Sequence, residues 1–181
     1  SVEHLVAAEV VARAIETNRL SPSFYFQLGA AYERHQQFDE ATQSFRKCLE
    51  LAPDFSEALN YLGYMWAERG ENLAEAREMI EKAVKQEPKN AAFLDSLGWV
   101  LYRLNQPKDA LACLLKAIEY SKDLDATLHD HLGDVYRALE EPEKARQAWE
   151  KSLTLEPNDD KAAIRKKLDS LKAEPRMLVF Y

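Results

Sequence analysis

The stretch YFQLGAAY, residues 25–32, carries a Leu-Gly pair between two aromatic residues, and the Leu-Gly pair recurs in three later copies. The later copies read LNYLGYMW at 59–66, LDSLGWVL at 94–101 and HDHLGDVY at 129–136. Their glycines, Gly29, Gly63, Gly98 and Gly133, stand 34, 35 and 35 residues apart. A period of this length is typical of chains built from stacked helical hairpins.

Each copy is followed by a small, a large and another small residue, spaced by four and then three positions. The four sets are Ala41, Phe45 and Cys48; Ala76, Ile80 and Ala83; Ala110, Leu114 and Ala117; and Ala145, Trp149 and Ser152. This spacing places three side chains on one face of a helix. Pro107 and Pro142 stand where the first turn of such a helix tolerates a missing N–H. A glycine inside a helix costs roughly 1 kcal/mol relative to alanine. We therefore expect the alanines that open the four sets to lie close against the glycines and offset this cost.

These features resemble the tetratricopeptide repeat family, whose pattern is aromatic-x2-Leu-Gly-x2-aromatic, then Ala-x3-Phe, then a closing proline. The resemblance covers residues 22 to about 158. Pro53, Pro88 and Pro157 close three copies, whereas the remaining one has Lys122 at that place. The resemblance implies an all-α fold, a right-handed α-solenoid of antiparallel helix hairpins.

The predicted organisation is a single array. Its parts are the second helix of a preceding partial repeat at 1–21, repeats at 22–55, 56–90, 91–125 and 126–159, a capping helix at 160–173 and an apolar tail at 174–181. A free-standing capping helix at the start remains an alternative. The tail residues 177–181 either open a further element or dock onto the array or a neighbouring chain. We interpret Arg165, Lys166 and Lys167 as the solvated face of the capping helix.

Composition excludes several classes of function. With 24 basic and 31 acidic residues, the net charge of −7 argues against a nucleic-acid binder. No stretch approaches the roughly 20 apolar residues that cross a bilayer, so direct membrane insertion is not expected. The two cysteines, Cys48 and Cys113, are expected to be buried thiols too distant to pair.

The sequence also argues against an enzyme. His129, Asp130, His131 and Asp134 look like metal ligands on paper, but helix residues two apart point about 200° around the axis, so the histidines do not share one ion easily. No nucleophile elbow and no glycine-rich phosphate loop is present. We therefore expect no catalytic residue, no metal and no cofactor.

In the resembling family, the first helix of each hairpin lines a concave groove. Tyr61, Tyr64, Trp99 and Tyr102 are surplus to the packing pattern and are expected to stand half exposed as an aromatic stripe, the alternative being that they pack against neighbouring repeats. The candidate partner-binding residues are Phe26, Asn60, Tyr61, Tyr64, Asp95, Trp99, Tyr102, Arg103, Asp130, His131 and Asp134.

The charge around this stripe indicates the kind of partner. Glu57 and Glu68 join Asp95, Asp130 and Asp134 in an acidic rim, which favours a protein or peptide with apolar anchors and some basic residues. The clamp of Lys, Asn and Arg that some family members use for a C-terminal carboxylate is absent here, and so is the asparagine ladder.

The predicted function is a protein–protein interaction module or scaffold that binds a peptide or protein segment in this groove. The alternative is an architectural spacer or self-association element, assembled through the 177–181 tail or the open N-terminal end. The stretches at 58–67 and 94–104 look like the arrays of bacterial envelope tetratricopeptide lipoproteins and adaptor proteins. That similarity favours the bacterial cell envelope or periplasm, with the cytoplasm next.

Overall fold

A computed structural model of the protein describes residues 2–4, 6–7, 9, 20–123, 125–156 and 161–173. These residues form α-helices and the turns between them, and the described part contains no strand. Residues 2–4, 6–7 and 9 are helical, while the rest of the predicted first helix and the 177–181 tail lie outside the described residues. The chain divides into two compact units, Ser1–Pro88 and Lys89–Tyr181.

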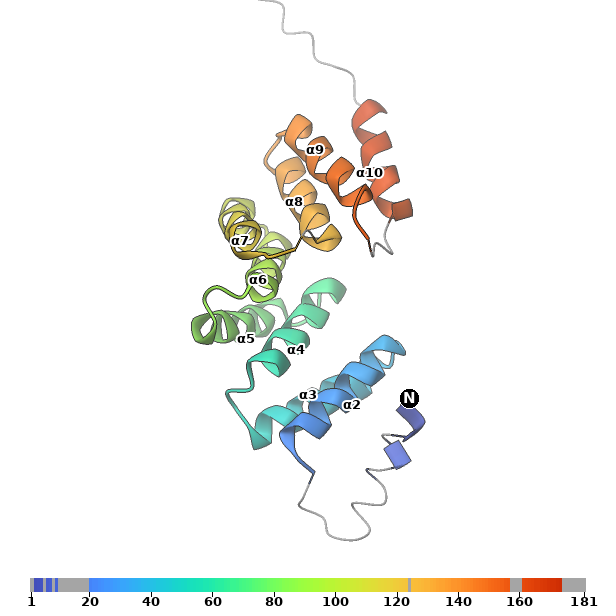
Figure 1. Ribbon diagram of the computed structural model, residues 1–181, viewed down its shortest axis with the longest axis vertical. Helices are drawn as coiled ribbons and strands as arrows, with labels where there is room; N and C mark the ends of the chain where they lie inside the picture. Colours follow the sequence, from blue (N-terminus) through green and yellow to red (C-terminus); the bar gives the residue numbers. More distant parts are fainter. Residues whose placement is uncertain are drawn as a thin grey trace, which may run out of the picture. The chain divides into compact units, whose positions relative to one another are not determined.

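The first unit contains two helical hairpins (Figure 1). One pairs α2 (Pro22–Arg34) with α3 (Phe38–Leu51), and the other pairs α4 (Ser56–Arg69) with α5 (Leu73–Gln86). Helix α4 also contacts both helices of the preceding hairpin. Helix α4 therefore packs against the whole preceding hairpin, as a stacked hairpin array requires.

The second unit repeats this arrangement and adds one helix. Helix α6 (Ala91–Arg103) pairs with α7 (Pro107–Tyr120), and α8 (Ala126–Ala138) pairs with α9 (Pro142–Leu153). Helix α8 contacts both α6 and α7, and α10 (Lys161–Ala173) lies beside α9 (Figure 1). The apolar stripe of α10 packs there: Ile164 is buried against Ala145 and Trp149, with Leu168 and Leu171 at its edge.

Local sequence signals set where the helices begin. The side chains of Ser21, Asn90 and Asp125 accept hydrogen bonds from the first free N–H groups of α2, α6 and α8. Pro107 and Pro142 each stand at the first position of a second helix, as predicted, because the missing N–H has no partner there in any case.

The two helices of each hairpin are in tight contact at the repeated glycine. A Cβ atom placed on Gly133 would lie 2.3 Å from Cδ1 and Nε1 of Trp149, and one placed on Gly98 would lie 2.7 Å from Leu114. The alanines lie close to the glycines in two hairpins, as expected: the Ala76 carbonyl is 2.9 Å from a Cβ on Gly63, and the Ala110 carbonyl is 3.2 Å from one on Gly98. The large residue of the second helix also occupies the space beside each glycine.

The predicted small, large, small sets form the core of each hairpin. Phe45, Ile80, Leu114 and Trp149 are each at most 2% exposed, and their small neighbours are fully buried. In the last hairpin, the Ser152 hydroxyl donates to the Ala126 carbonyl at 2.7 Å, which satisfies a buried polar group. The core therefore lies between the helices of each hairpin and leaves one side of every first helix for other contacts.

Gly133→Ala should destabilise the protein by about 2 kcal/mol or more, because the rigid, buried Trp149 indole has to move to admit a methyl group. Gly98→Ala meets Cδ2 and Cγ of Leu114, both at 2.7 Å, and the Ala110 carbonyl at 3.2 Å. Because a leucine side chain shifts more easily than an indole, this variant should cost less, about 1 kcal/mol. Urea unfolding of the two variants, followed by circular dichroism, measures the difference. Equal stability of Gly133→Ala and the unmodified protein would contradict this account of the glycines.

Candidate functional site

In the first unit, the predicted residues Phe26 and Tyr61 come together in an aromatic cluster, defined here as Phe26, Phe55 and Tyr61. The Phe26 ring stacks on Phe55 with centroids 5.4 Å apart, and Tyr61 meets it edge-on at 5.3 Å. Beneath them lies the buried Phe45, whose centroid is 5.9 Å from that of Phe26. Tyr61 nevertheless remains 44% exposed, whereas Phe26 and Phe55 are half-buried.

A buried thiol lies near this cluster. Cys48 is fully buried, and burial, with a smaller effect from the Glu57 carboxylate, raises the pKa of its thiol to about 11. The thiol therefore stays protonated at neutral pH and is a poor nucleophile. Cys113 is also a free thiol but is only partly buried, so the expectation of burial is wrong for this residue.

The two other candidates of the first unit, both on α4, differ in exposure. Asn60 is 7% exposed, and its side-chain oxygen is buried without a hydrogen-bond partner. Tyr64 is half-buried, as the predicted stripe requires. Glu57 and Glu68 of the predicted rim lie exposed on the same helix. Helix α4 thus presents the exposed Tyr61 ring between the exposed carboxylates of Glu57 and Glu68.

In the second unit, the predicted rings stack on one another. Trp99 lies 5.1 Å from Tyr102 and 4.2 Å from the His131 ring, nearly parallel to both, with the Arg103 guanidinium 5.7 Å from its centroid. Trp99 is only 9% exposed and His131 only 4%. The expectation that all four rings stand half exposed is therefore wrong for Trp99, because its neighbours on α6 and α8 cover it.

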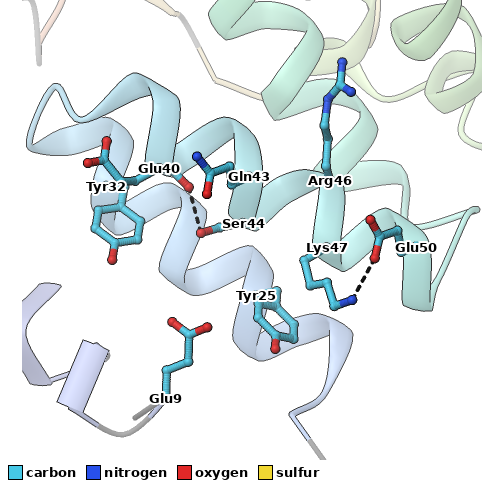
Figure 2. A pocket seen from close by; sticks show the side chains of 9 residues that line it. All are labelled: Glu9, Tyr25, Tyr32, Glu40, Gln43, Ser44, Arg46, Lys47 and Glu50. Carbon is cyan, nitrogen blue, oxygen red and sulfur yellow. Dashed lines mark hydrogen bonds and ion pairs between the residues drawn. The ribbon is translucent and has the colours of Figure 1, made fainter. Parts of the chain in front are cut away.

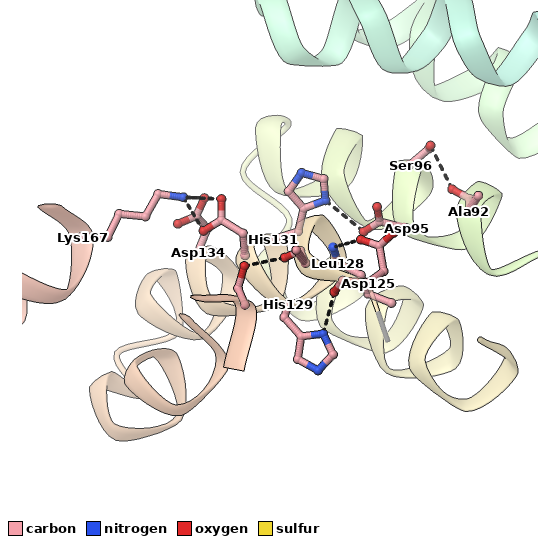
Figure 3. A network of polar contacts seen from close by, with 12 residues as sticks. Ala92, Asp95, Ser96, Asp125, Leu128, His129, His131, Asp134 and Lys167 are labelled. Atoms are coloured by element: carbon pink, nitrogen blue, oxygen red, sulfur yellow. Dashed lines mark hydrogen bonds and ion pairs between the residues drawn. The ribbon is translucent and has the colours of Figure 1, made fainter. Parts of the chain in front are cut away.

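The buried His131 is held by a carboxylate from the preceding first helix. Its Nδ1 lies 2.9 Å from Oδ1 of Asp95, whose side chain is 15% exposed (Figure 3). The remaining predicted pair, Asp130 and Asp134, lies one turn apart on α8. All seven candidates of this unit therefore belong to α6 and α8, the first helices of its two hairpins.

Lys167 of α10 reaches this carboxylate pair. Its ammonium donates to both oxygens of Asp130, at 2.8 and 3.0 Å. It also donates to Asp134 at 2.7 Å (Figure 3). The interpretation of Arg165, Lys166 and Lys167 as a solvated face is therefore wrong for Lys167, which is 29% exposed, whereas Arg165 and Lys166 are exposed. We call Asp130, Asp134 and Lys167 the charged cluster.

Burial shifts the ionisation of this cluster. It raises the pKa of Asp134, and the Lys167 ammonium offsets that rise only in part. Burial alone would lower the pKa of Lys167, but the carboxylates of Asp134 and Asp130 outweigh it and raise that pKa. Tyr102 borders the cluster, and burial together with the Asp134 charge raises the pKa of its phenol.

A separate pocket of about 470 Å³ lies on another side of the first hairpin (Figure 2). Tyr25 and Tyr32 line it together with carboxylates, Arg46 and Lys47. Several of its polar groups satisfy one another: the Ser44 hydroxyl donates to the Glu40 carbonyl at 2.8 Å, and Lys47 pairs with Glu50 at 2.8 Å. Because its polar groups are engaged internally, this pocket does not indicate a ligand.

Among the described residues, neither a metal-ligand group nor a membrane-spanning helix is found. Over the described ranges, no three His, Cys, Asp or Glu residues converge as ligands would. His129 turns its Nδ1 to the Asp125 carbonyl at 2.8 Å (Figure 3), whereas His131 faces Asp95. None of the helices described here combines the length and the apolar character needed to cross a bilayer.

Two family descriptions match the chain. Residues 22–55 match the tetratricopeptide repeat, and residues 66–173, more than half of the chain, match the tetratricopeptide repeat-like domain. The chain therefore belongs to the tetratricopeptide repeat family. Proteins of this family generally mediate protein–protein interactions, and family and fold are typical of scaffolds without catalytic activity.

Among curated relatives, a tetratricopeptide repeat-containing protein of Pseudomonas aeruginosa, PA4667, is 36% identical over 97 residues. This match covers 54% of the present chain and 16% of that protein. The type IV pilus assembly protein PilF of the same species is 29% identical over 142 residues, which cover 77% of the chain and 56% of PilF. The chain thus spans only part of the length of both relatives.

Solved structures support the fold. The P. aeruginosa PilF structure has a TM-score of 0.67 at 26% identity, covering 83% of this chain and 67% of PilF. TTC0263 of Thermus thermophilus has a TM-score of 0.69 at 16% identity, covering 95% of this chain and 99% of its own. The predicted all-α solenoid of helix hairpins is confirmed, as is the resemblance on which it rested.

Sequence reasoning missed two contributors to these clusters. Phe55 precedes α4 and lies outside the repeat pattern, so no signal singled it out. Lys167 carried a signal that went unused: it stands 36 residues after His131 and three after the buried Ile164, on the side of α10 that meets the array.

Lys167→Met should make stability more dependent on pH. Since burial raises the pKa of Asp134 in the folded protein above its unfolded value of about 3.9, the charged carboxylate opposes folding at neutral pH, and this cost disappears as pH falls through the folded pKa. Removing the ammonium enlarges the cost. Melting temperatures of the variant should therefore lie furthest below those of the unmodified protein at pH 7 and approach them towards pH 4.

Lys166→Met is the matched control, because Lys166 is exposed on the same helix. Its melting temperature should follow that of the unmodified protein at every pH. A difference for Lys167→Met that stays constant with pH would contradict the assigned role of the ammonium.

Proposed function

We propose that this chain is a protein-binding module whose principal contact surface is the aromatic cluster, part of the concave groove that the family's first helices line. The observation that carries the proposal is Tyr61, which remains 44% exposed although it packs edge-on against Phe26. A large ring held in place by other rings, yet open to solvent, is suited to receive an apolar side chain from a partner.

The energetics favour such a surface. Tyrosine rings carry a large share of binding energy at protein interfaces, and a ring that is already ordered loses little conformational entropy on binding. Phe26 and the buried Phe45 hold Tyr61 from the side of the protein and leave its outer part available. An aliphatic or aromatic anchor covering this ring would remove its exposed apolar area from water.

Charge defines the rest of the partner. Glu57 and Glu68 lie exposed on the same helix as Tyr61, and the net charge of the chain is −7. A segment with an apolar anchor and one or two lysine or arginine residues complements both features. The relation to PilF, a pilus assembly protein, supports a scaffold role of this kind.

The candidate residues of the second unit are not proposed as the principal contacts with the partner. Trp99 and His131 are buried in their own stack in the second unit, so they are not expected to contact the partner directly. Tyr102 and Arg103 border that stack, while Asp95, Asp130 and Asp134 are each engaged with a basic side chain. Tyr64 and Asn60 flank Tyr61 along α4. Partner contact is expected first at Tyr61 and only secondarily at the charged residues.

Site-specific photo-cross-linking tests the proposal in the native cell. A benzophenone amino acid at position 61 should yield a covalent adduct with one partner, and Phe26→Ala in the same chain should reduce the adduct several-fold, because Phe26 orients this ring. The measurement is the adduct band and its identification by mass spectrometry.

Leu51 supplies the control. It is 49% exposed in the same unit but lies on the second helix α3. A cross-linker at position 51 should not capture the same partner. Equal capture from positions 51 and 61 would place the binding surface elsewhere.

The alternative prediction, self-association, rests on residues 177–181 and on the N-terminal end, which lie largely outside the described residues. Light scattering of the chain with and without residues 174–181 tests it. A mass that falls from dimer to monomer on truncation would favour assembly, whereas identical monomer masses would leave the tail without that role.

A further inference from the structure

Helix α4 carries an exposed ring and an exposed carboxylate one turn apart. Tyr61 is 44% exposed, and Glu57, four residues earlier on the same helix, is exposed as well. Side chains four residues apart lie on one face of a helix, with Cβ atoms about 5–6 Å apart. A single side chain of a partner can therefore touch both the ring and the carboxylate.

The carboxylate of Glu57 lies at the aromatic cluster and keeps most of its hydrogen-bonding capacity. Its Oε2 is 3.3 Å from the Ser56 hydroxyl, which is closer, at 2.8 Å, to Glu87. In the part of the chain that the structure describes, no lysine or arginine pairs with it. Burial and then the Glu57 charge raise the pKa of the Cys48 thiol, which also meets the backbone of Phe26.

Two rings of the same unit are each covered by an arginine that also pairs with a carboxylate. These sets of arginine, ring and carboxylate are Arg46, Trp66 and Glu75, and Arg69, Phe38 and Glu71. The guanidinium carbons lie 5.4 and 4.2 Å from the ring centroids, and guanidinium nitrogens lie 3.4 and 2.6 Å from the carboxylate oxygens. Within the described ranges, no cation lies over Tyr61 in this way, so Tyr61 and Glu57 present the ring and the carboxylate without the arginine.

A guanidinium suits this pair better than an ammonium does. It is planar, so it stacks on an aromatic ring, and its fork of N–H donors matches the two oxygens of a carboxylate. The apolar stem of an arginine also covers ring surface while its charged end stays at the carboxylate. A lysine ammonium is a compact, strongly hydrated charge that gains less from the ring. The net charge of −7 favours the approach of either cation.

We propose that Tyr61 and Glu57 together form an arginine-binding site: the guanidinium of a partner's arginine lies over the Tyr61 ring and pairs with the Glu57 carboxylate. This inference rests on the proposed function and deepens it, because one residue of the partner then supplies both the apolar contact and the positive charge. Phe26 and Phe45 hold the ring in place, so the site is formed before the partner binds.

An NMR titration of the full, nitrogen-15-labelled chain tests the proposal with two acetylated, amidated peptides, Ala-Arg-Ala and Ala-Lys-Ala. The backbone amide signals of residues 57–61 report binding at this part of α4. The arginine peptide should bind there about fivefold more tightly than the lysine peptide, which is the advantage expected of a guanidinium over an exposed ring. Equal affinities of the two peptides would overturn the proposal.

Variants of α4 separate the contribution of the ring from that of the charge. Tyr61→Leu should remove the preference for arginine, whereas Tyr61→Phe should keep it, because phenylalanine retains the ring. Glu57→Gln should weaken binding of the arginine peptide about threefold, as the loss of an exposed ion pair does. Glu68→Gln is the matched control, since it removes the same charge from an exposed position of the same helix, seven residues after Tyr61. An equal change in the two glutamine variants would contradict the role of Glu57.

Circular dichroism checks that each variant is folded, and Glu57→Gln, at an exposed position, decides the test if Tyr61→Leu unfolds. A third peptide, Ala-Leu-Ala, separates this inference from the proposed function. Tighter binding of that peptide than of the arginine peptide would overturn the arginine site and leave an apolar anchor on the aromatic cluster. Failure of the cross-linking at position 61 would instead contradict the proposed function itself.

Discussion

The close approach of the two helices at each repeated glycine is the constraint on which the other features depend. At these positions the first helix carries no side chain, and Phe45, Ile80, Leu114 or Trp149 of the second helix fills the space. Such a contact fixes the distance between the paired helices and also their rotation, because a large side chain fits only where the glycine faces it. The residues on either side of each glycine are therefore held in a defined direction.

This constraint places chemically different residues at equivalent positions of successive first helices. Gln27, Tyr61, Ser96 and His131 stand at the same place of the repeat, one residue after Phe26, Asn60, Asp95 and Asp130. In the first unit that place supplies Tyr61, which packs against Phe26 and stays open to solvent. In the second unit it supplies His131, which pairs with Asp95 under Trp99. One backbone arrangement thus carries an apolar surface in one unit and a polar network in the other.

The sequence predicted the hairpins well because the signals for them are local and periodic. The glycine spacing, the small, large, small sets and the prolines at the starts of α7 and α9 each concern residues within one hairpin. Prediction failed where the outcome depended on the next hairpin along. Whether Trp99 is open or covered is decided by His131, 32 residues away, and the family pattern describes the face on which a side chain lies but not what covers it.

The same limit explains Lys167. On a helical wheel a lysine beside Arg165 and Lys166 belongs to a polar surface, and only the position of α8 relative to α10 brings two carboxylates to its ammonium. A charged residue near the edge of an apolar stripe reaches across the boundary when its stem is long enough. Sequence periodicity assigns the direction of the Cα–Cβ bond, whereas the destination of a flexible side chain depends on partners from elsewhere in the chain.

The unequal burial of the two thiols makes selective chemical labelling of one cysteine feasible. Cys48 is sealed in the first hairpin with its proton retained, while Cys113 lies partly open on α7. A maleimide dye under mild conditions should therefore react faster with Cys113 than with Cys48. A dye at Cys113 would lie on α7, which contributes no residue to the aromatic cluster or to the charged cluster.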